Sequence, residues 1–600
     1  MKNLLVNTKL LTIILFLLFL LPSCNNEEIF VVEESAIVVE ETEPTEEEDA
    51  PNTEDEVIPI DVVDDTVTTT ENIAVDLEPY LNDENLPQTI TISNTNPSNG
   101  VLTINDNSTP NNFLDDSIVY TPNAGFSGID SFDYTVCDAS NSENCDTATV
   151  TITVEAVIDD IETELKAFPG AEGYGKNAVG GRGGRIIKVT NLNNSGSGSF
   201  RAACEASGSR IVVFEIGGRI NLTSTVTIND PFITIAGQTA PGDGITLSME
   251  GTPNEVVLQV QANDVIIRYL TIRRSESEVS EQNSDCLVIT SCHDVIVDHC
   301  SFSWASDENI AIYDYDGNNR ANVYNVTIQN SLIDTAWGGI DKGIICSGGV
   351  DRLTFYNLVF ASVGQRQPLI KNETGNYANE ETYFEIINTV TLEGKWHASF
   401  PNNIAAAGTK HLNYINNLCI DSGFSRNMLF VDTAYPVSIF TQGNISPLRT
   451  SITSPVNWDE EWSVIQAGGG QDDVEKRLTT DYRVTTPKST PIINDGVVLT
   501  KAVNLVDSLK DHVGASYPTR DSEDTRAIND VVTRTSTAAN TSGTFPILDS
   551  GTPLTDSDND GMSDAWEDAN GYNKNIDDSL EDRDGDGYTN IEEFLNRTLD

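Results

Sequence analysis

Two acidic loops near the C-terminal end carry the most explicit chemical pattern in the sequence. The first places oxygen-bearing side chains and one glycine at positions 1, 3, 5, 6, 9 and 12 of a twelve-residue segment: Asp556, Asp558, Asp560, Gly561, Asp564 and Glu567. Alternating carboxylates can direct oxygen atoms at one centre, the glycine permits a sharp turn, and the final glutamate can supply two oxygens. This spacing predicts a calcium-binding loop.

A second loop repeats the spacing with Asp582, Asp584, Asp586, Gly587, Asn590 and Glu593. We therefore assign residues 552–600 to tandem EF-hand-like calcium repeats, similar to those of dockerins or thrombospondin-type repeats. Their expected role is structural, because no catalytic group accompanies them. An acidic, solvated tail without a bound ion is the alternative.

The cysteines offer little chemistry of their own. Cys137 and Cys145 are close together in one predicted hairpin and could form a disulfide in an oxidising compartment. Apart from Cys24, the other cysteines fall within apolar runs and lack metal-ligand spacing. We expect these to be small buried hydrophobic residues.

The elements that must position any active site come from a repeat in the middle of the chain. Strand-like units start at residues 264, 294, 325, 352, 383 and 411, so that successive starts differ by 27 to 31 residues. A period of this length, with apolar and β-branched strands, indicates a solenoid. Each repeat offers only about three short strands, which favours a parallel β-helix over a propeller. We expect a mainly β fold whose centre is a right-handed parallel β-helix over residues 167–545.

One polar position recurs once in every repeat. The sixth residue of successive units reads Tyr269, His299, Asn330, Asn357, Asn388 and Asn416. Stacked turns would let each asparagine amide form a hydrogen bond with its neighbour along the axis. Near the end of this domain, a short helix around residues 503–513 is expected to pack back on the coils.

A smaller β domain precedes the repeat. Residues 67–156 contain short alternating strands separated by turn residues, including 74–77, 89–92, 117–121, 130–136 and 147–154. The segment resembles bacterial cadherin-like or Ig-like adhesion modules. No catalytic constellation occurs in it, so we expect a spacer or glycan-contacting β-sandwich.

The overall charge restricts the partners. With 34 basic and 93 acidic residues, the formal net charge is −59. So strong a negative field disfavours nucleic acid as a ligand. It also disfavours a polyanionic substrate unless bound cations or local basic residues offset it. Residues 25–66 hold much of the acid and are expected to form a disordered tether. We expect the protein to be a monomer.

The N-terminal segment indicates export. Lys2 and Lys9 precede the apolar run 10–21, which is short for a membrane span. The run ends in Leu21-Pro22-Ser23-Cys24, which resembles a bacterial lipobox, so residues 1–24 are assigned to a lipoprotein signal peptide with Cys24 lipidated. Asn25-Asn26-Glu27-Glu28 follow, and acidic residues this close to Cys24 resemble the surface-export signal of Bacteroidetes lipoproteins. We expect an outer-membrane lipoprotein at the cell surface; an ordinary secretory signal is the alternative.

Five motifs in the repeat domain carry a resemblance to a known family. In order they are AFPGAEGYG at 167–175, DVIVDHCS at 294–301, SWASDEN at 303–309, RQP at 366–368 and VGASYPTRD at 513–521. Together they resemble polysaccharide lyase family 1, the pectate lyases, and in particular the lineage common in Bacteroidetes. The resemblance implies β-elimination across C4–C5 of a uronate chain, with calcium as cofactor and an acidic polysaccharide as substrate.

The resemblance also implies which side chains act. Arg366, with Pro368 and Lys371, fits the family's Arg-x-Pro-x-x-Arg/Lys pattern, in which the first arginine removes the C5 proton. Lys342 is similar in place to a lysine that contacts the substrate carboxylate. Lys371 stands where a second arginine is often found and lacks its bidentate geometry. The alternatives are a solvated loop cation for Arg366 and a surface lysine in a salt bridge with Asp341 for Lys342.

The implied calcium ligands are Asp298, in the family's Asp-His motif, with Asp307 or Glu308 on the next segment. The commoner pattern has two acids four residues apart, but here the residue four after Asp307 is Ala311, which cannot bind a metal. Either Glu308 compensates or the substrate carboxylate completes the site. For Asp307, hydrogen bonding within a coil is the alternative.

These observations predict a pectate lyase that cleaves (1→4)-α-D-galacturonan by calcium-assisted β-elimination. A lyase acting on methylated pectin or another uronate polymer is a second possibility, and a non-catalytic surface glycan-binding or adhesion protein is a third. Glycoside hydrolysis in the same fold would need paired carboxylates facing one cleft. The basic residues Arg366, Lys342 and Lys371 argue against it.

Overall fold

The structure is a computed structural model that describes residues 58–597, apart from a set of internal segments. Those left out are 71–72, 88, 106–116, 124–125, 156–164, 251, 253, 275–283, 315–322, 335–341, 372–380, 393–397, 402–407, 421–427, 432–435, 448, 452–455, 468–481 and 538–543. The chain divides into two compact units, residues 1–158 and 159–600. Among the described residues, no helix has the length and apolar character needed to cross a bilayer.

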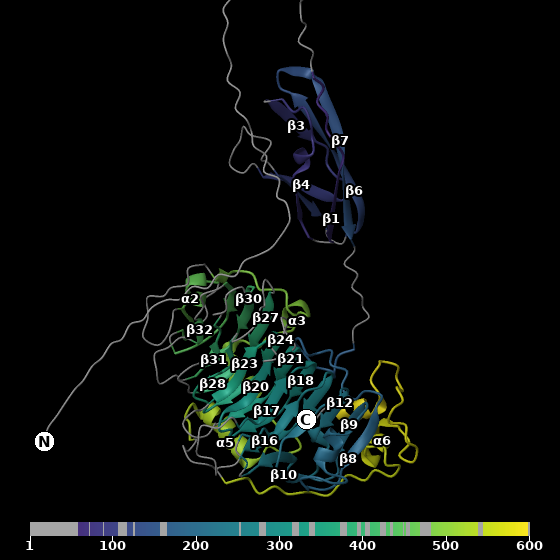
Figure 1. The fold of residues 1–600 in the computed structure, drawn as a ribbon, viewed down its shortest axis with the longest axis vertical. Helices are drawn as coiled ribbons and strands as arrows, with labels where there is room; N and C mark the ends of the chain where they lie inside the picture. The colour runs from purple at the N-terminus through teal and green to yellow at the C-terminus, as the bar shows by residue number, and fades with distance from the viewer. Residues whose placement is uncertain are drawn as a thin grey trace, which may run out of the picture. The chain divides into compact units, whose positions relative to one another are not determined.

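The first unit is a sandwich of two small sheets (Figure 1). One sheet has the order β1-β7-β6-β3, with bounds Asp65–Thr70, Asn141–Glu155, Gly128–Asp138 and Ile90–Asn94. The other has the order β2-β5-β4, with bounds Val75–Leu77, Ser117–Pro122 and Gly100–Asn105, and a 3-10 helix η1 covers Pro79–Leu81. Strands β5, β6 and β7 alternate buried and more exposed residues, which places Tyr120, Tyr134 and Val150 in one core.

The sandwich begins earlier than its sequence suggested. Ile60 and Val62 are 4% and 8% exposed and belong to its core, and Asp61 pairs with Glu84. The prediction of a tether over 25–66 is therefore wrong for residues 58–66. The acidic composition there masked an apolar alternation, whose side chains the sheet buries; the rest of that segment lies outside the described residues.

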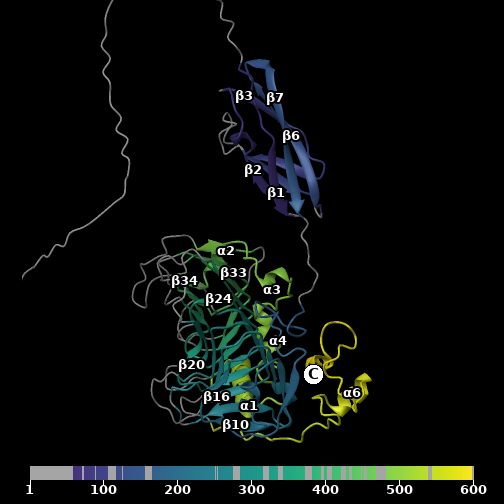
Figure 2. The same ribbon diagram turned by 45° about the vertical axis from the view of Figure 1, so that its right-hand side comes forward.

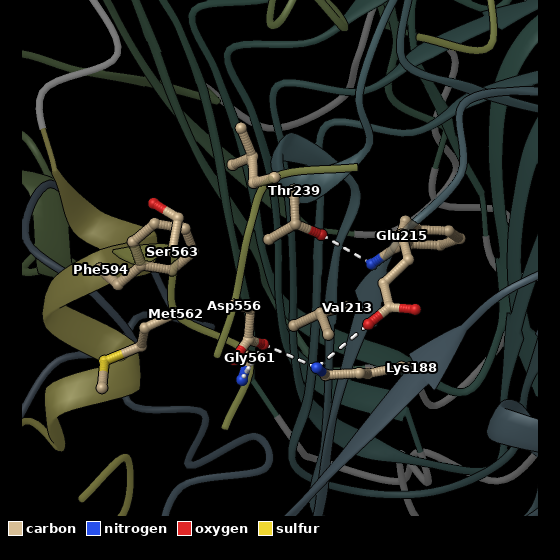
Figure 3. A pocket seen from close by; sticks show the side chains of 11 residues that line it. Lys188, Val213, Glu215, Thr239, Asp556, Gly561, Met562, Ser563 and Phe594 are labelled. Carbon is tan, nitrogen blue, oxygen red and sulfur yellow. Dashed lines mark hydrogen bonds and ion pairs between the residues drawn. The ribbon is translucent and has the colours of Figure 1, made fainter. Parts of the chain in front are cut away.

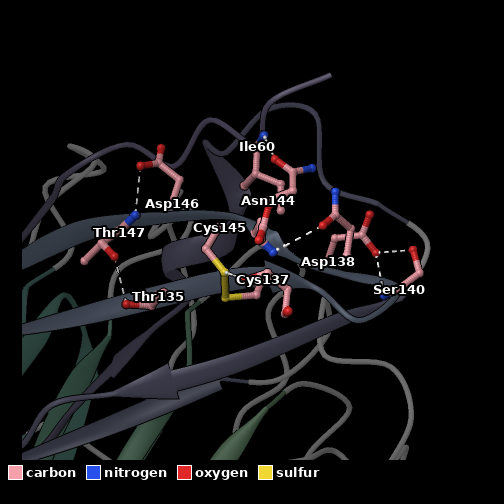
Figure 4. The surroundings of a disulfide bond; sticks show 12 residues. Ile60, Thr135, Cys137, Asp138, Ser140, Asn144, Cys145, Asp146 and Thr147 are labelled. Carbon is pink, nitrogen blue, oxygen red and sulfur yellow. Dashed lines mark hydrogen bonds between the residues drawn. A yellow bond between two sulfur atoms is a disulfide. The ribbon is translucent and has the colours of Figure 1, made fainter. Parts of the chain in front are cut away.

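A disulfide joins the two longest strands of the sandwich (Figure 4). Cys137 on β6 and Cys145 on β7 are partners in the antiparallel register, and their sulfur atoms lie 2.04 Å apart. The six other cysteines of the described residues are buried free thiols in the second unit, as expected for small apolar side chains.

The second unit is a parallel β-helix made of three long sheets (Figures 1 and 2). The eleven-stranded sheet contains β8 Arg185–Val189, β9 Arg210–Phe214, β12 Ile233–Ala236, β15 Val265–Arg268, β18 His293–Asp298, β21 Val323–Gln329, β24 Val350–Tyr356, β27 Thr382–Ile387, β30 Lys410–Ile415, β33 Val437–Gln442 and β35 Arg483–Val484. Its strands are nearly all apolar on their inner positions, because parallel sheets in a solenoid are covered on both faces.

Two further sheets complete each coil. The eight-stranded sheet contains β10 Gly218–Leu222, β13 Ile245–Met249, β16 Thr271–Arg274, β19 Ser301–Ser303, β22 Leu332–Asp334, β25 Val359–Ala361, β28 Val390–Leu392 and β31 Leu418–Cys419. The nine-stranded sheet contains β11 Val226–Ile228, β14 Leu258–Val260, β17 Leu287–Thr290, β20 Glu308–Asp314, β23 Lys342–Gly348, β26 Leu369–Ile370, β29 Ala398–Ser399, β32 Leu429–Val431 and β34 Ile465–Ala467.

The recurrent polar position is a corner of the coil, between the eleven- and eight-stranded sheets. All six of its residues have positive φ, between 48° and 56°. Asparagine tolerates this left-handed conformation better than most residues, which explains its recurrence there. The predicted ladder is confirmed between Asn330 and Asn357, where Nδ2 of Asn357 donates to Oδ1 of Asn330 at 3.0 Å.

Other segments cover the outer faces of two sheets. Residues 165–184 lie along the eleven-stranded sheet, where Phe168 and Ala178 pack on Ile266 and Ile296. The predicted helix is present as η4 (Ala502–Asn504) and α4 (Leu505–Leu509), and with α5 (Ser522–Thr533) it packs on the eight-stranded sheet. The remaining short elements are α1 Phe200–Cys204, η3 Gly237–Thr239, α2 Trp458–Trp462, α3 Pro491–Asn494, α6 Asp564–Asn570 and α7 Asn590–Asn596.

Candidate active site

Charged residues gather where strands of the nine-stranded sheet begin. Leu287 of β17 pairs with Ile310 of β20, so Asp285 lies level with Glu308 in the next coil. Glu308 in turn pairs with Lys342 of β23. Neighbouring parallel strands keep their residues in register. Three residues from consecutive coils therefore form one column across the sheet edge.

Three carboxylates meet at this column, two from within it and one from the neighbouring Asp307. Asp285, Asp307 and Glu308 each present an oxygen within 4.8 Å of the other two. Asp285 and Glu308 are buried, whereas Asp307 is half-buried. The backbone N–H of Glu308 donates to Oδ1 of Asp285 at 2.9 Å, which ties two successive coils together at the cluster.

Two cations lie against these acids. Lys342 forms an ion pair with Asp307, and its Nζ lies 3.8 Å from Oε1 of Glu308. Arg366 forms an ion pair with Glu308. The side chains of Lys342 and Arg366 retain 16% and 22% of their exposure, so both reach the surface. Sequence reasoning did not foresee that these cations and acids pair with each other.

The backbone around Arg366 is held in a fixed position. Its carbonyl accepts a hydrogen bond from the N–H of Ile344 at 2.7 Å. A Cβ at Gly343 would lie 2.6 Å from that carbonyl oxygen, so the close approach requires glycine. Arg366 itself has φ of 64°, which turns the chain sharply at the entrance to β26.

The electrostatics of the cluster centre on Asp285. Burial raises the pKa of Asp285 to about 7, although Lys342, Arg274 and Arg366 each act to lower it. Arg274 is itself buried, and its guanidinium donates to the carbonyls of Glu255 and Thr252. A buried carboxyl of this kind, beside cations and other acids, is a typical feature of a functional site.

Lys371 lies one residue beyond β26. Its N–H donates to the carbonyl of Cys346 at 2.9 Å. Side chains alternate along a strand, so Lys371 shares a face with Leu369, which packs on the outer surface of this sheet near Ala311 and Ile345. Lys371 is half-buried and follows the outer face of this sheet.

The comparisons with known proteins decide the family. A family model described as a bacterial Ig domain matches residues 50–153. A probable pectate lyase C of Aspergillus terreus is 34% identical over 452 residues, which are 72% of this chain and 94% of that protein. The chain belongs to the pectate lyase family. A probable pectate lyase C of Aspergillus flavus is also 34% identical, over 448 residues with the same shares covered.

The solved structures are less similar to this chain than these relatives are. The major allergen of cedar pollen, jun a 1, is 16% identical with a TM-score of 0.36, covering 59% of this chain and 95% of that one. The pectate lyase Bsp165PelA from Bacillus sp. N165, solved with trigalacturonate, is 16% identical with a TM-score of 0.31, covering 57% and 98%. Family membership and the three-sheet coil together make this protein a polysaccharide lyase with a parallel β-helix.

Asp298, predicted as a calcium ligand from its motif, lies elsewhere. Its carboxylate is fully buried and accepts hydrogen bonds from Nε of Arg268 at 3.0 Å and from Nε2 of Gln329 and Nδ2 of Asn330 at 2.9 Å. Nδ1 of His299 lies 2.9 Å away. Burial would raise the pKa of Asp298, but His299, Arg268 and these hydrogen bonds hold it well below its usual range.

These contacts give Asp298 a role within the coil, and its part in binding calcium stays a prediction. Both of its oxygens already serve partners within the coil, and the acidic groups of the described residues that could hold a metal do not include it. Its place in the Asp-His motif reflects the structure of the corner, where His299 also stacks on Tyr269 with ring centroids 4.8 Å apart.

Asp285 is the site residue that sequence reasoning missed. The repeat was aligned on strands of the eleven-stranded sheet, and Asp285 belongs to the nine-stranded one. An alignment of the apolar runs 287–289 and 310–312 would place Asp285 opposite Glu308, because these two residues lie 23 positions apart, as the paired residues of their strands do.

The two tail loops differ in the structure. Each brings its first three aspartates together: Asp556, Asp558 and Asp560 in the first, and Asp582, Asp584 and Asp586 in the second, where all three are exposed. Burial raises the pKa of Glu567 to about 7, and Asp558, Asp560, Asp564 and Asp578 raise it further. Glu593, at position 12 of the second loop, is half-buried.

The side chain at position nine of each loop forms hydrogen bonds with nearby residues of the tail. The oxygens of Asp564 accept hydrogen bonds from N and Oγ of Ser557. Asn590 accepts from the N–H of Arg583 and donates to the carbonyl of Asp578. These contacts hold both side chains near the start of a helix, and the supply of metal oxygens by Asp564 and Asn590 stays a prediction.

Proposed function

We propose that this protein cleaves pectate by β-elimination at the cluster of Asp285, Asp307, Glu308, Lys342 and Arg366. The observation that carries this proposal is the convergence of three acids and two cations on one edge of a pectate lyase β-helix. The protein has a net charge of −59, which disfavours a polyanionic substrate. The two cations offset this charge at the place where such a substrate would bind.

The acids fit a calcium ion. Their donor set is entirely carboxylate oxygen, which hard cations such as Ca²⁺ prefer, and three carboxylates can supply part of its six to eight ligands. Asp285, Asp307 and Glu308 would hold the ion, with substrate carboxylate or water completing the shell. When bound, calcium neutralises a uronate carboxylate and thereby acidifies the adjacent C5 proton. Ala311 lies outside this set and is buried against Ile345.

The two cations then take separate roles. Lys342 and Arg366 at present neutralise the same carboxylates that would hold the ion. Relieved of these partners, Lys342 can pair with a substrate carboxylate. Arg366 can accept the C5 proton once its guanidinium has released a proton to solvent, a loss that nearby cations and removal from water favour. In that step the C5–H bond breaks, a C4–C5 double bond forms, and the C4–O bond breaks to release the next sugar, whose oxygen takes a proton. Lys371 contributes charge to an adjoining subsite.

The test compares Arg366→Ala and Arg366→Lys with wild type on polygalacturonate, following the ultraviolet absorbance of the unsaturated product. Arg534→Gln is the matched control, because Arg534 is an exposed residue at the end of α5. We expect both Arg366 variants to lose activity and the control to retain it. Undiminished product formation by Arg366→Ala would remove Arg366 from the mechanism.

We also propose that the protein is exported and held at the outer membrane through Cys24, with the enzyme facing outward as a monomer. The lipobox-like sequence that supports this lies outside the described residues. Metabolic labelling with a radioactive fatty acid tests it: wild type should incorporate label and Cys24→Ala should not. Equal labelling of the two would contradict the anchor.

A further inference from the structure

The first tail loop holds buried acids that lack partners. Glu567 is fully buried and Asp560 is 1% exposed. Both carboxylate oxygens of Glu567, both of Asp558 and one of Asp560 are buried without a hydrogen-bond partner. Carboxylates left in this way are strongly unfavourable unless a cation compensates them.

A further acid comes from outside the twelve-residue loop. Asp578 lies in the connection to the second loop, and its Oδ1 is also buried without a hydrogen-bond partner. Asp578 is within electrostatic reach of Glu567, as are Asp558 and Asp560. These buried carboxylates therefore influence one another electrostatically, which the spacing of the first loop alone does not reveal.

This loop is attached to the β-helix (Figure 3). Nζ of Lys188, on strand β8, lies 2.6 Å from Oδ2 of Asp556 and 2.7 Å from Oδ1 of Asn559. The same nitrogen lies 3.0 Å from Oε1 of Glu215. A Cβ at Gly561 would lie 2.9 Å from Ile186, so the turn of the loop rests directly on β8.

Apolar contacts continue the attachment. Met562 from the loop and Ile591, Phe594 and Leu595 from α7 share one core with Ile211, Val213 and Ala236 of strands β9 and β12. Arg182 forms an ion pair with Glu592 at 2.9 Å. The tail therefore covers the outer face of the eleven-stranded sheet at its first strands, where apolar side chains would otherwise meet water.

We propose that the first tail loop binds one calcium-type cation through Asp556, Asp558, Asp560, Glu567 and Asp578, and that this ion fastens the tail to strands β8 and β9. An all-oxygen set of flexible carboxylates favours calcium over transition metals. The cation acts on the stability of the β-helix, separately from the lyase site. The second loop is not included, because its aspartates are exposed and the described residues give it no comparable buried acid.

The test uses the full-length protein and the metal alone. Trp566 lies beside Glu567 and is the only tryptophan after residue 462, so its excitation can sensitise terbium bound in place of calcium. We expect terbium luminescence that calcium displaces in wild type, and an affinity at least about tenfold weaker in Glu567→Gln, as is common when a metal site loses an interaction. Glu581→Gln, an exposed acid between the loops, is the matched control and should behave as wild type.

Hydrogen exchange supplies the second readout. Chelation should raise the exchange of amides in β8 and β9 in wild type, and Glu567→Gln should show raised exchange even with calcium. Asp558→Asn, at a half-buried position, gives the same comparison if Glu567→Gln fails to fold. Absence of terbium binding at this loop, or unchanged exchange of β8 and β9 on chelation, would overturn the proposal. Neither result depends on lyase activity.

Discussion

Replacing Asp285 by asparagine should stabilise the calcium-free protein while it disables the enzyme. Burial raises the pKa of Asp285 to about 7, whereas the pKa of a free aspartate is about 4. The folded state therefore holds this proton more tightly than the unfolded state. The contribution of Asp285 to stability is therefore largest below about pH 4, falls between about pH 4 and 7, and stays low above.

The size of the effect follows from the same values. A difference of about three pH units corresponds to roughly 4 kcal/mol as an upper bound for the ionised carboxyl. Asp285→Asn removes that charge, so at pH 8 without calcium its thermal unfolding should occur above that of wild type. At pH 4 the two proteins should unfold together.

Asp298→Asn is the contrasting variant, and it should do the opposite. Asp298 is fully buried and pairs with Arg268 and His299. Removing one partner of a buried ion pair destabilises a protein by about 3–5 kcal/mol. Because the folded-state pKa of Asp298 is depressed, this stabilisation is present at neutral pH and is lost as pH falls below about 4.

Calorimetry with and without calcium distinguishes the two roles. Calcium should raise the unfolding temperature of wild type and of Asp298→Asn by the same amount, and that of Asp285→Asn by less. The tail loops are unaltered in all three proteins, so their contribution cancels in this comparison. If Asp298→Asn lost the calcium response and Asp285→Asn kept it, the placement of the catalytic calcium would be wrong.

Three further outcomes are expected. Arg366→Ala should lower kcat by about 100- to 10,000-fold, the usual contribution of a positioned acid or base, in initial rates on polygalacturonate. Burial lowers the pKa of Lys410 to about 7, so between about pH 7 and 10 only the unfolded chain keeps the proton of this lysine. The contribution of Lys410 to stability should therefore rise over that range, and calorimetry of Lys410→Met should not show this rise. The double variant Cys137→Ser and Cys145→Ser should destabilise the Ig-like unit by about 2 kcal/mol, seen as faster proteolysis within residues 58–155, with lyase activity unchanged.

The sequence predicted the parts of the fold that repeat. The spacing of the starts at 264, 294 and 325 predicted a coiled repeat. The recurring asparagine lies at a corner of that coil, where Asn330 and Asn357 adopt the left-handed backbone conformation that asparagine tolerates. What the repeat could not reveal is which residues on different sheets come together. Asp285 reaches the site only through the register of β17 with β20, which the aligned strands did not include.

Motif similarity did not reveal which residues bind one another within the fold. Asp298 has a catalytic-looking neighbourhood in sequence, yet Arg268 lies a whole coil away and binds its carboxylate. Likewise, the spacing of the tail acids indicated a metal loop but gave no sign that Lys188, 368 residues earlier, would bind Asp556. Contacts between segments so distant in sequence leave no local pattern.

The central claim is that the cluster at Asp285 and Arg366 breaks the glycosidic bond by elimination. Digesting polygalacturonate in water labelled with heavy oxygen, and weighing the products by mass spectrometry, tests this directly. The account predicts unsaturated oligogalacturonides whose new ends carry no label, formed with calcium and absent after chelation. Saturated products that have taken up heavy oxygen at the cleaved bond would show hydrolysis and contradict it.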